Sequence, residues 1–405
     1  MAATEPTGPG DAASTPDAPA PARWRTWPLL AAGFVTAFGA HAIAANLGRY
    51  ATGRHASLLE LGVLLALYDG AEVLLKPAFG ALADRIGARP VLLGGLVAFA
   101  GASAAFVLAG EQDALAAARF AQGAAAAAFS PAASALVARL SPVDRRGRAF
   151  GSYGAWKGLG YTTGPLLGGG LITLGGFPLL FTVLAAIGLA VAGWAAITVP
   201  AAPPLPRSRE TLVGLARRLT EPSFLQPVLA LAGATAALSA GVGFLPVHGA
   251  QTGLGPLATG AAVSLLALAA ALIQPRAGRA HDSGRLPAVA GMTIGLVLAG
   301  AGFAAAVVLS GLPGLLLAGL AIGIGTGLVT PLGFARLAAT APVGRLGQTM
   351  GAAEVGRELG DIGGPMLVGT IAGVAGLGLG TGLLGLAGML LLLAASATSW
   401  RRQAN

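Results

Sequence analysis

Long apolar runs separated by short polar loops make up most of this 405-residue chain. Each run provides the roughly 20 apolar residues that a helix needs to cross the hydrocarbon core of a bilayer. The pattern predicts an all-α membrane protein with twelve transmembrane helices, near residues 27–48, 58–80, 89–110, 114–139, 148–173, 177–199, 224–247, 255–275, 286–310, 314–338, 348–373 and 377–399.

Two polar stretches interrupt this pattern. Residues 1–25 are rich in Pro, Ala and Thr and have no early apolar core, which predicts a disordered cytoplasmic tail rather than a targeting peptide. Residues 200–223 contain five prolines and four arginines and predict a cytoplasmic connector. The connector separates an N-terminal six-helix half (26–199) from a C-terminal half (224–400), which a short cytoplasmic tail (401–405) follows.

Composition excludes several classes of protein. Apolar residues make up 55% of the chain and charged residues only 10%, whereas soluble domains carry about 25% charged residues. The net charge of +9 does not indicate a nucleic-acid-binding protein, because the basic residues lie in short clusters between apolar runs. With no cysteine, no phosphate-binding Gly-x4-Gly-Lys-Ser/Thr run and no cluster typical of a metal site, we expect no cofactor, no metal, no ATP-driven pump and no enzyme.

The arginines predict the orientation in the membrane. Nineteen of them fall in segments that share one side of the predicted topology, and only Arg49 and Arg54 fall in the loops on the other side. Positively charged residues stay cytoplasmic during insertion. We therefore expect both termini in the cytoplasm.

The two predicted halves resemble each other in sequence. Pro142, Arg145, Gly164 and Pro165 recur 200 residues later as Pro342, Arg345, Gly364 and Pro365. Helices rich in Ala, Gly and Leu align by chance rather easily, but a shared register through both loop and helix makes chance a poor explanation. Repeated six-helix halves are typical of secondary transporters, whose substrate path lies at the repeat interface.

Three motifs carry a resemblance to a known family. The loop Gly80-Ala-Leu-Ala-Asp84-Arg85-Ile-Gly87-Ala-Arg89 resembles the signature loop of the major facilitator superfamily. Arg119-Phe-Ala-Gln122-Gly123 is similar to the fourth-helix motif of its proton-linked exporters. The spacing of the fifth-helix motif of its antiporters is matched by Gly151, Gly160, Gly164, Pro165, Gly168 and Gly169. The resemblance spans residues 27–400, with His281-Asp282-Ser283 in the second half where the first has Ala83-Asp84-Arg85, and it is the sole ground for expecting export.

Each motif also has a physical interpretation. Gly80 and Gly87 permit a tight turn, and Asp84 could lie at the positive N-terminus of a neighbouring helix and latch one conformation. Alternatively the loop charges, including Arg89 and Arg139, only set topology. The fifth-helix glycines and Pro165 allow close packing and a bend, with or without a role in transport direction.

Charges inside apolar helices are the strongest functional signal. Asp69, Glu72 and Lys76 share one helix face, and Glu354, Arg357, Glu358 and Asp361 form a similar stripe on another helix, while Arg119 and Lys157 lie in two further helices. Each such charge costs about 2.5–3.5 kcal/mol at the centre of a membrane helix, so it must face protein or water. Five acids and four bases leave one acid without a partner, which proton coupling would require.

We interpret Asp69 as the proton-carrying carboxyl, with Asp361 as second choice and Arg119 as the cation that tunes it; mutual pairing, as between Glu72 and Lys76, is the structural alternative. His41 could titrate near neutral pH or serve packing. The aromatic residues Tyr68, Tyr153, Trp156 and Tyr161 could stack on a planar or cationic substrate or simply pack.

These features together predict a monomeric transporter of the major facilitator type in the cell membrane. It would exchange protons for small drug-like or metabolite compounds by alternating access. The alternatives are a symporter or facilitator for uptake and, from a different class, a membrane sensor or scaffold that does not transport.

Overall fold

The computed structural model describes residues 26–52, 58–108, 112–201, 221–342, 344–374 and 378–403, and these ranges contain helices and no strand. The helices are α1 (Trp27–Thr52), α2 (Leu58–Ile86), α3 (Ala88–Leu108), α4 (Gln112–Leu140), the 3₁₀ turn η2 (Val143–Arg145), α5 (Arg146–Thr198), α7 (Pro222–Gln251), α8 (Pro256–Asp282), α9 (Ala288–Val308), α10 (Gly311–Thr340), α11 (Leu346–Gly373) and α12 (Gly378–Gln403). The predicted tail 1–25 and most of the predicted connector, residues 202–220, lie outside the described residues.

Most helices extend a few residues beyond the apolar runs that predicted them. The clearest case is α8, which runs on to Asp282 through Arg276 and Arg279. Hydropathy detects only the part of a helix that suits the hydrocarbon core, whereas backbone hydrogen bonds continue into the polar region.

Helix α5 is bent sharply near its middle. The backbone leaves helical geometry at Gly175 (φ −152°, ψ 20°) and Gly176 (φ 71°, ψ −176°). The positive φ at Gly176 is accessible mainly to glycine, and Pro178 lies two residues further on, where the backbone is helical again. The break falls between the two helices expected at 148–173 and 177–199.

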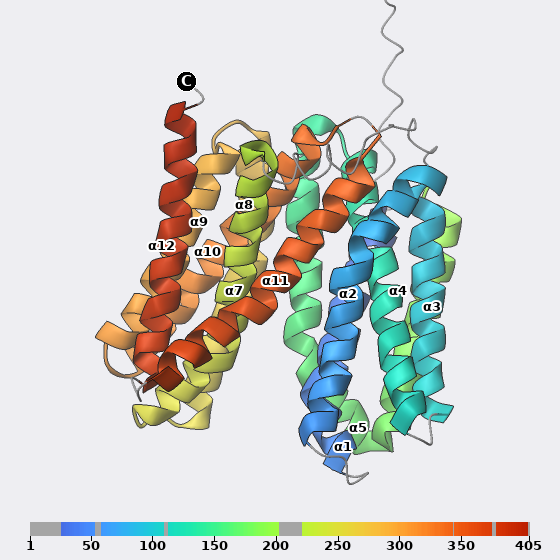
Figure 1. Cartoon of the computed structure of the whole chain (residues 1–405), viewed down its shortest axis with the longest axis horizontal. Helices are drawn as coiled ribbons and strands as arrows, with labels where there is room; N and C mark the ends of the chain where they lie inside the picture. Colours follow the sequence, from blue (N-terminus) through green and yellow to red (C-terminus); the bar gives the residue numbers. More distant parts are fainter. Residues whose placement is uncertain are drawn as a thin grey trace, which may run out of the picture.

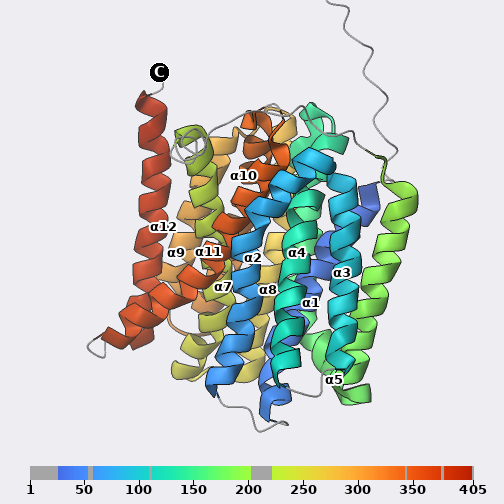
Figure 2. The ribbon, with the colours of Figure 1, turned by 45° about the vertical axis from the view of Figure 1, so that its right-hand side comes forward.

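The helices form two bundles that meet along α2, α5, α8 and α11 (Figure 1). The N-terminal bundle contains α1–α5 and the C-terminal bundle contains α7–α12. The bundles touch through α2 against α11 and through α5 against α8. The turned view shows α11 running beside α2 (Figure 2). One apolar cluster crosses this interface, and in it the rings of Phe150 and Phe334 stack with their centroids 5.5 Å apart.

Glycines bring the two bundles into backbone contact at the end where the C-terminus lies. A Cβ atom at Gly351 in α11 would lie 2.6 Å from the Lys76 carbonyl oxygen in α2. A Cβ atom at Gly147 in α5 would lie equally close, 2.6 Å, to the Gly278 carbonyl oxygen in α8. Larger residues would therefore force the bundles apart at both contacts.

Eight helical stretches in the described residues are long and apolar enough to cross a membrane, and Trp27–Ile43 is a shorter apolar helix. The stretch Val143–Thr198 would measure about 80 Å if straight, against a hydrocarbon thickness of about 30 Å. The helices α2 and α11 are not among the eight, and they carry the two stripes of charged residues.

Candidate functional site

A cavity of about 520 Å³ lies between the two bundles. Its wall is formed by α1, α5, α7, α8, α10 and α11, with Phe150 and Phe334 on the side where the bundles touch. The charged residues Lys157, Arg357, Glu358 and Asp361, all singled out in the sequence, line it together with Pro165 of the fifth-helix motif. The cavity is within the 300–1,000 Å³ typical of sites for drug-sized ligands.

One group of buried charges joins α2 to α11. Lys76 Nζ lies 2.8 Å from Glu72 Oε2 in its own helix and 2.6 Å from Glu358 Oε1 in α11. The Tyr68 hydroxyl donates a hydrogen bond to Glu72 Oε1 at 3.4 Å. We name Glu72, Lys76 and Glu358 the acidic triad, because two carboxylates share one ammonium group.

A second group joins α5 to α11 with the opposite balance. Glu354 Oε2 lies 3.0 Å from Lys157 Nζ and 3.2 Å from Arg357 Nη1, and Glu354 is fully buried. The Ser134 hydroxyl donates to the other Glu354 oxygen at 3.3 Å. We name Lys157, Glu354 and Arg357 the basic triad, since one carboxylate serves two cations.

Asp69 and Asp361 stand apart from both triads, and neither forms an ion pair within the described part of the chain. Both line a side chamber of about 40 Å³, together with His41, Glu72 and Glu358. Asp361 also lines the main cavity, whereas Asp69 does not. The structure thus places the two preferred candidates for proton transfer on one shared chamber.

Arg119 lies deep in the N-terminal bundle, away from both cavities. Its Nη1 donates to Gln122 Oε1 at 2.8 Å, and its guanidinium carbon lies 4.3 Å from the centre of the Tyr68 ring. It is 1% exposed and, like Lys76, does not line the main cavity. Any influence of Arg119 on Asp69 is therefore exerted inside the bundle.

The signature loop contacts the other bundle through Asp84. Its two carboxylate oxygens accept hydrogen bonds from the backbone N–H groups of Gly347 (2.7 Å) and Gln348 (2.9 Å), in the first turn of α11. Gly87 has φ 99°, which a tight turn between α2 and α3 requires. Arg85 lies in the last turn of α2, and Arg89 donates to the Ala196 carbonyl oxygen of α5.

Sequence reasoning missed the equivalent contact in the C-terminal half. Asp282 accepts hydrogen bonds from the backbone N–H groups of Gly147 and Arg148, both at 2.8 Å, in the first turn of α5. The sequence places Asp282 in a degraded motif between His281 and Ser283. Its position in the repeat, opposite Asp84, is the signal that could have identified it.

The fifth-helix motif packs against two different helices. Gly160, Gly164 and Gly168 face α1 near Phe38 and Ala42, and Gly151 faces α8 near Gln274. Gly169 is half-buried, and Pro165 lines the main cavity. These glycines let α5 pack closely against α1 in its own bundle and against α8 in the other bundle.

Of the four aromatic candidates, two line the main cavity and two do not. Tyr153 and Tyr161 line the main cavity with His41, whose ring lies edge-on to Tyr161 at 4.3 Å. Tyr68 lines the side chamber, and Trp156 lies edge-on to Phe34 at 6.4 Å. The cavity-lining residues that sequence reasoning missed include Phe150, Phe334, Ser239 and Gln274.

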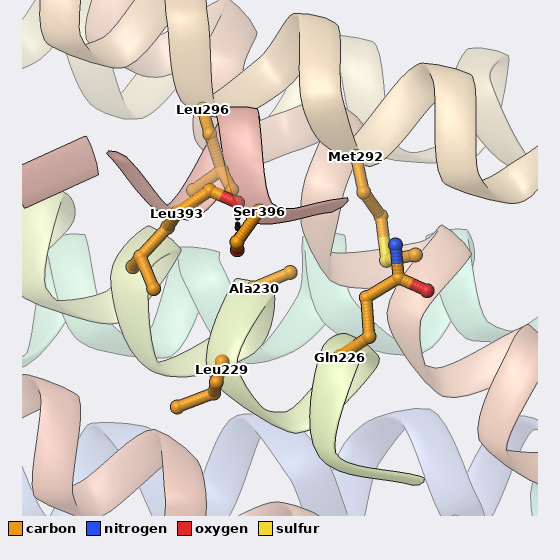
Figure 3. A pocket seen from close by; sticks show the side chains of 7 residues that line it. All are labelled: Gln226, Leu229, Ala230, Met292, Leu296, Leu393 and Ser396. Carbon is orange, nitrogen blue, oxygen red and sulfur yellow. Dashed lines mark hydrogen bonds between the residues drawn. The ribbon is translucent and has the colours of Figure 1, made fainter. Parts of the chain in front are cut away.

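A further hollow in the described residues is far smaller than the main cavity. A hollow between α7, α9 and α12 measures about 10 Å³, room for about one water molecule (Figure 3). No group of three or more His, Asp or Glu side chains in the described ranges has a geometry that would hold a metal ion.

Comparisons with known proteins agree with this architecture. Residues 29–365 match the family model described as Major Facilitator Superfamily. Tetracycline resistance proteins of class C and class B from Escherichia coli are 33% identical over 108 residues and 40% identical over 112 residues. Each match covers 27% of this chain and 27% of the relative, so this chain matches only about a quarter of their length.

Solved structures share the fold over nearly the whole chain. The human organic anion transporter MFSD10 (TETRAN) superposes with a TM-score of 0.75 at 21% identity, covering 93% of this chain and 99% of that one. The Escherichia coli fucose:proton symporter FucP, in a single-residue variant, gives 0.74 at 14% identity, covering 92% and 98%. At these identities the likeness concerns the fold alone.

Proposed function

This chain belongs to the Major Facilitator Superfamily, and from that premise we propose that it is a proton-coupled antiporter that exports small drug-like or metabolite compounds. Members of this family are multi-pass membrane transporters, so the coarse function is transport of a small solute. The names of the curated relatives refer to tetracycline resistance, which supports export of a drug-like compound from a bacterial cell through the plasma membrane.

The proposed topology has twelve transmembrane helices, with α5 counted as two around its break at Gly175 and Gly176. Both termini lie in the cytoplasm, where the arginine-rich loops place them. Residues 26–199 and 224–400 then form the two halves, and residues 200–223 form a cytoplasmic connector. With this orientation the bundles touch at the cytoplasmic end.

The observation that carries the coupling proposal is the pairing of the buried charges. Lys76, Lys157 and Arg357 each contact a carboxylate, while Asp69 and Asp361 have no ion pair in the described structure. A buried carboxylate without a cation takes up a proton readily, because burial disfavours its charged form. Asp69 is our first choice for the proton carrier and Asp361 the second, with Arg119 as the cation that favours proton release.

Transport in inverted membrane vesicles tests this function. With the interior acidified, accumulation of an exported compound from a panel that includes tetracycline should rise, and collapse of the pH gradient by a protonophore should stop it. Vesicles without the protein give the background. Accumulation that stays the same with and without the gradient would refute proton coupling and leave a facilitator.

A further inference from the structure

The acidic and basic triads each contain one ion pair within a helix and one ion pair between the bundles. The pairs within a helix are Glu72–Lys76 in α2 and Glu354–Arg357 in α11. The pairs between the bundles are Lys76–Glu358, at 2.6 Å, and Lys157–Glu354, at 3.0 Å. Separation of the bundles therefore breaks one ion pair in each triad and leaves the other in place.

The pair between Lys76 and Glu358 lies beside the backbone contact of α2 with α11. A Cβ atom at Gly351 would lie 2.6 Å from the Lys76 carbonyl oxygen, and Glu358 follows Gly351 by about two turns of the same helix. Alternating access requires the bundles to separate at this end. In that motion Lys76, which is 1% exposed, moves away from Glu358 and needs another anion beside it.

The two triads differ in what happens when a carboxylate takes up a proton. A proton on Glu358 removes one negative charge, and Lys76 is still bonded to Glu72 at 2.8 Å. A proton on Glu354 would instead leave both cations of the basic triad buried without their shared anion, which is strongly unfavourable. Of the two pairs between the bundles, Lys76–Glu358 is therefore the one that protonation can break without leaving a buried charge alone.

Glu358 is also the member of the acidic triad that protons reach most directly. It lines both the main cavity and the side chamber, whereas Glu72 lines only the side chamber and Lys76 lines neither. Asp69 and Asp361 line the same side chamber, so a proton carried by either acid can pass to Glu358 inside it. That transfer leaves a carboxylate at the donor and a neutral carboxyl group at Glu358.

Charged and titratable side chains from four helices surround Glu358. They are His41 of α1; Tyr68, Asp69, Glu72 and Lys76 of α2; Lys157 and Tyr161 of α5; and Glu354, Arg357 and Asp361 of α11. Arg119 of α4 lies over the Tyr68 ring, and α7 contributes uncharged side chains to the main cavity. Of these groups, Lys76 is the one that forms an ion pair with Glu358 in the described structure.

We propose that Glu358 couples protonation to the separation of the two bundles. When Glu358 takes up a proton, its ion pair with Lys76 is lost, Lys76 stays paired with Glu72, and α11 is released from α2. Loss of the proton re-forms the pair and closes the bundles at the end where they touch. The inference rests on the proposed function for the direction of the cycle, because protons taken up from outside then open the cavity to the cytoplasm.

The distance between the bundles, measured on purified protein in detergent without any pH gradient, tests the inference. Arg146 donates hydrogen bonds to the carbonyl oxygens of Ala138 in α4 and Ala338 in α10, at 3.1 and 3.3 Å, so the ends of these helices lie close together. Spin labels on Ser141→Cys and Thr340→Cys report the separation of these ends by pulsed electron spin resonance. Lowering the pH from about 8 to about 5 should raise the ratio of the separated to the closed state at least about tenfold, because the separated state binds the proton more tightly.

Two variants at the same ammonium group should have opposite effects. Glu358→Gln mimics the protonated acid, so the ratio of the separated to the closed state should already be about tenfold higher at about pH 8, and acid should add little. Glu72→Gln keeps the pair between the bundles, so the closed state should persist at about pH 8. Its response to acid should be weaker than that of the wild type, because a proton on Glu358 would leave Lys76 buried without an anion.

Asp144→Asn is the control, since the Asp144 side chain is 71% exposed in η2, and it should match the wild type at both pH values. A purely structural role of the triad would instead shift Glu358→Gln and Glu72→Gln in the same direction, which would overturn the inference. If Glu358→Gln does not fold, the wild type and Glu72→Gln still decide, because equal responses to acid in these two would overturn it.

Other outcomes that would overturn the inference are equally specific. A wild-type distance that ignores pH is one of them. Another is a response to acid as large in Glu358→Gln as in the wild type, which would assign the response to Asp84 and Asp282, the other carboxylates that join the bundles.

Transport in vesicles separates this inference from the proposed function. A distance that responds to pH through Glu358, together with vesicles that ignore the pH gradient, would refute the antiport function and leave the coupling of Glu358 to bundle separation intact. Gradient-driven export by a protein whose distance ignores pH would do the reverse.

Discussion

At the residue scale, the buried charged residues form two groups that both include residues of α11. One group has an excess of carboxylates and the other an excess of cations. The acidic triad has one carboxylate more than it has cations, and the basic triad has one cation more. Both triads connect α11 with the N-terminal bundle. Removal of a single carboxylate should therefore have very different effects in the two groups.

Glu354→Gln should destabilise the protein far more than Glu72→Gln does. The first change leaves Lys157 and Arg357 buried with no shared anion, which we expect to cost about 3–5 kcal/mol. The second leaves Lys76 bonded to Glu358 and should cost about 1 kcal/mol or less. Thermal unfolding of the purified variants, followed by tryptophan fluorescence, measures both, and equal losses would contradict the assigned pairing.

The coupling assignment is tested by neutral analogues of the two acids without an ion pair. Asp69→Asn mimics the permanently protonated form, so it should abolish gradient-driven export and leave exchange of substrate across the membrane intact. Asp361→Asn is the comparison, measured at saturating substrate so that weaker binding does not intervene. Normal export by Asp69→Asn with loss in Asp361→Asn would move the proton site to the C-terminal half, and normal export by both would favour a facilitator.

Sequence reasoning identified these charged residues but not their arrangement. The pair of Glu72 and Lys76 follows from helical spacing alone, and the structure contains it. The shorter contact of Lys76, to Glu358, joins residues 282 positions apart, and no pattern within one helix predicts it. The same holds for Gln274, which lines the main cavity from α8 and packs against glycines of α5.

At the scale of elements, two aspartates each hold the first turn of a helix in the opposite bundle. Asp84 at the end of α2 accepts from the first turn of α11, and Asp282 at the end of α8 accepts from the first turn of α5. A carboxylate there interacts with the positive end of the helix dipole as well as with free N–H groups. Both contacts form only while the bundles touch at this end.

Asp84→Asn and Asp282→Asn should each shift the balance between the two access states. A contact of about 1 kcal/mol changes the ratio of the states roughly fivefold, and the double variant should show the product of the two effects if the sites are independent. A cysteine in place of Val242, which lines the cavity, reports access through its rate of labelling from each side of the membrane. Unchanged labelling in the double variant would reduce both aspartates to topology signals.

The same elements show the limits of hydropathy. The predicted apolar runs overlap every α-helix that the structure describes, because burial in hydrocarbon demands mostly apolar residues. The charged helices α2 and α11 are not among the eight described stretches that are long and apolar enough to cross a membrane. Hydropathy underestimated the length of α8, because the last turns of that helix carry Arg276 and Arg279 beyond its apolar part. The break in α5 at Gly175 and Gly176 was expected as a boundary between two helices, and the structure shows its backbone geometry.

At the scale of the whole molecule, the proposed topology makes a direct prediction about accessibility. The chain has no cysteine, so single introduced cysteines give an unambiguous signal. Cysteines at Ser141, Ser208 and Ser283 should react with a membrane-impermeant maleimide only from the cytoplasmic side, and one at Ser57 only from outside; Ser57 and Ser208 lie outside the described residues. Labelling of Ser208→Cys from outside would contradict a cytoplasmic connector between the halves.

The placement of lysine gives the protein a reporter that needs no engineering. Lys76 and Lys157 are the only two lysines in the sequence, and they are 1% and 4% exposed. Lys157 lines the main cavity and Lys76 does not. Acetylation of the native protein should therefore modify Lys157 slowly, at a rate that follows how often and how widely the cavity opens, while Lys76 stays unmodified. Mass spectrometry of arginine-cleaved peptides would read conformational cycling directly from wild-type protein.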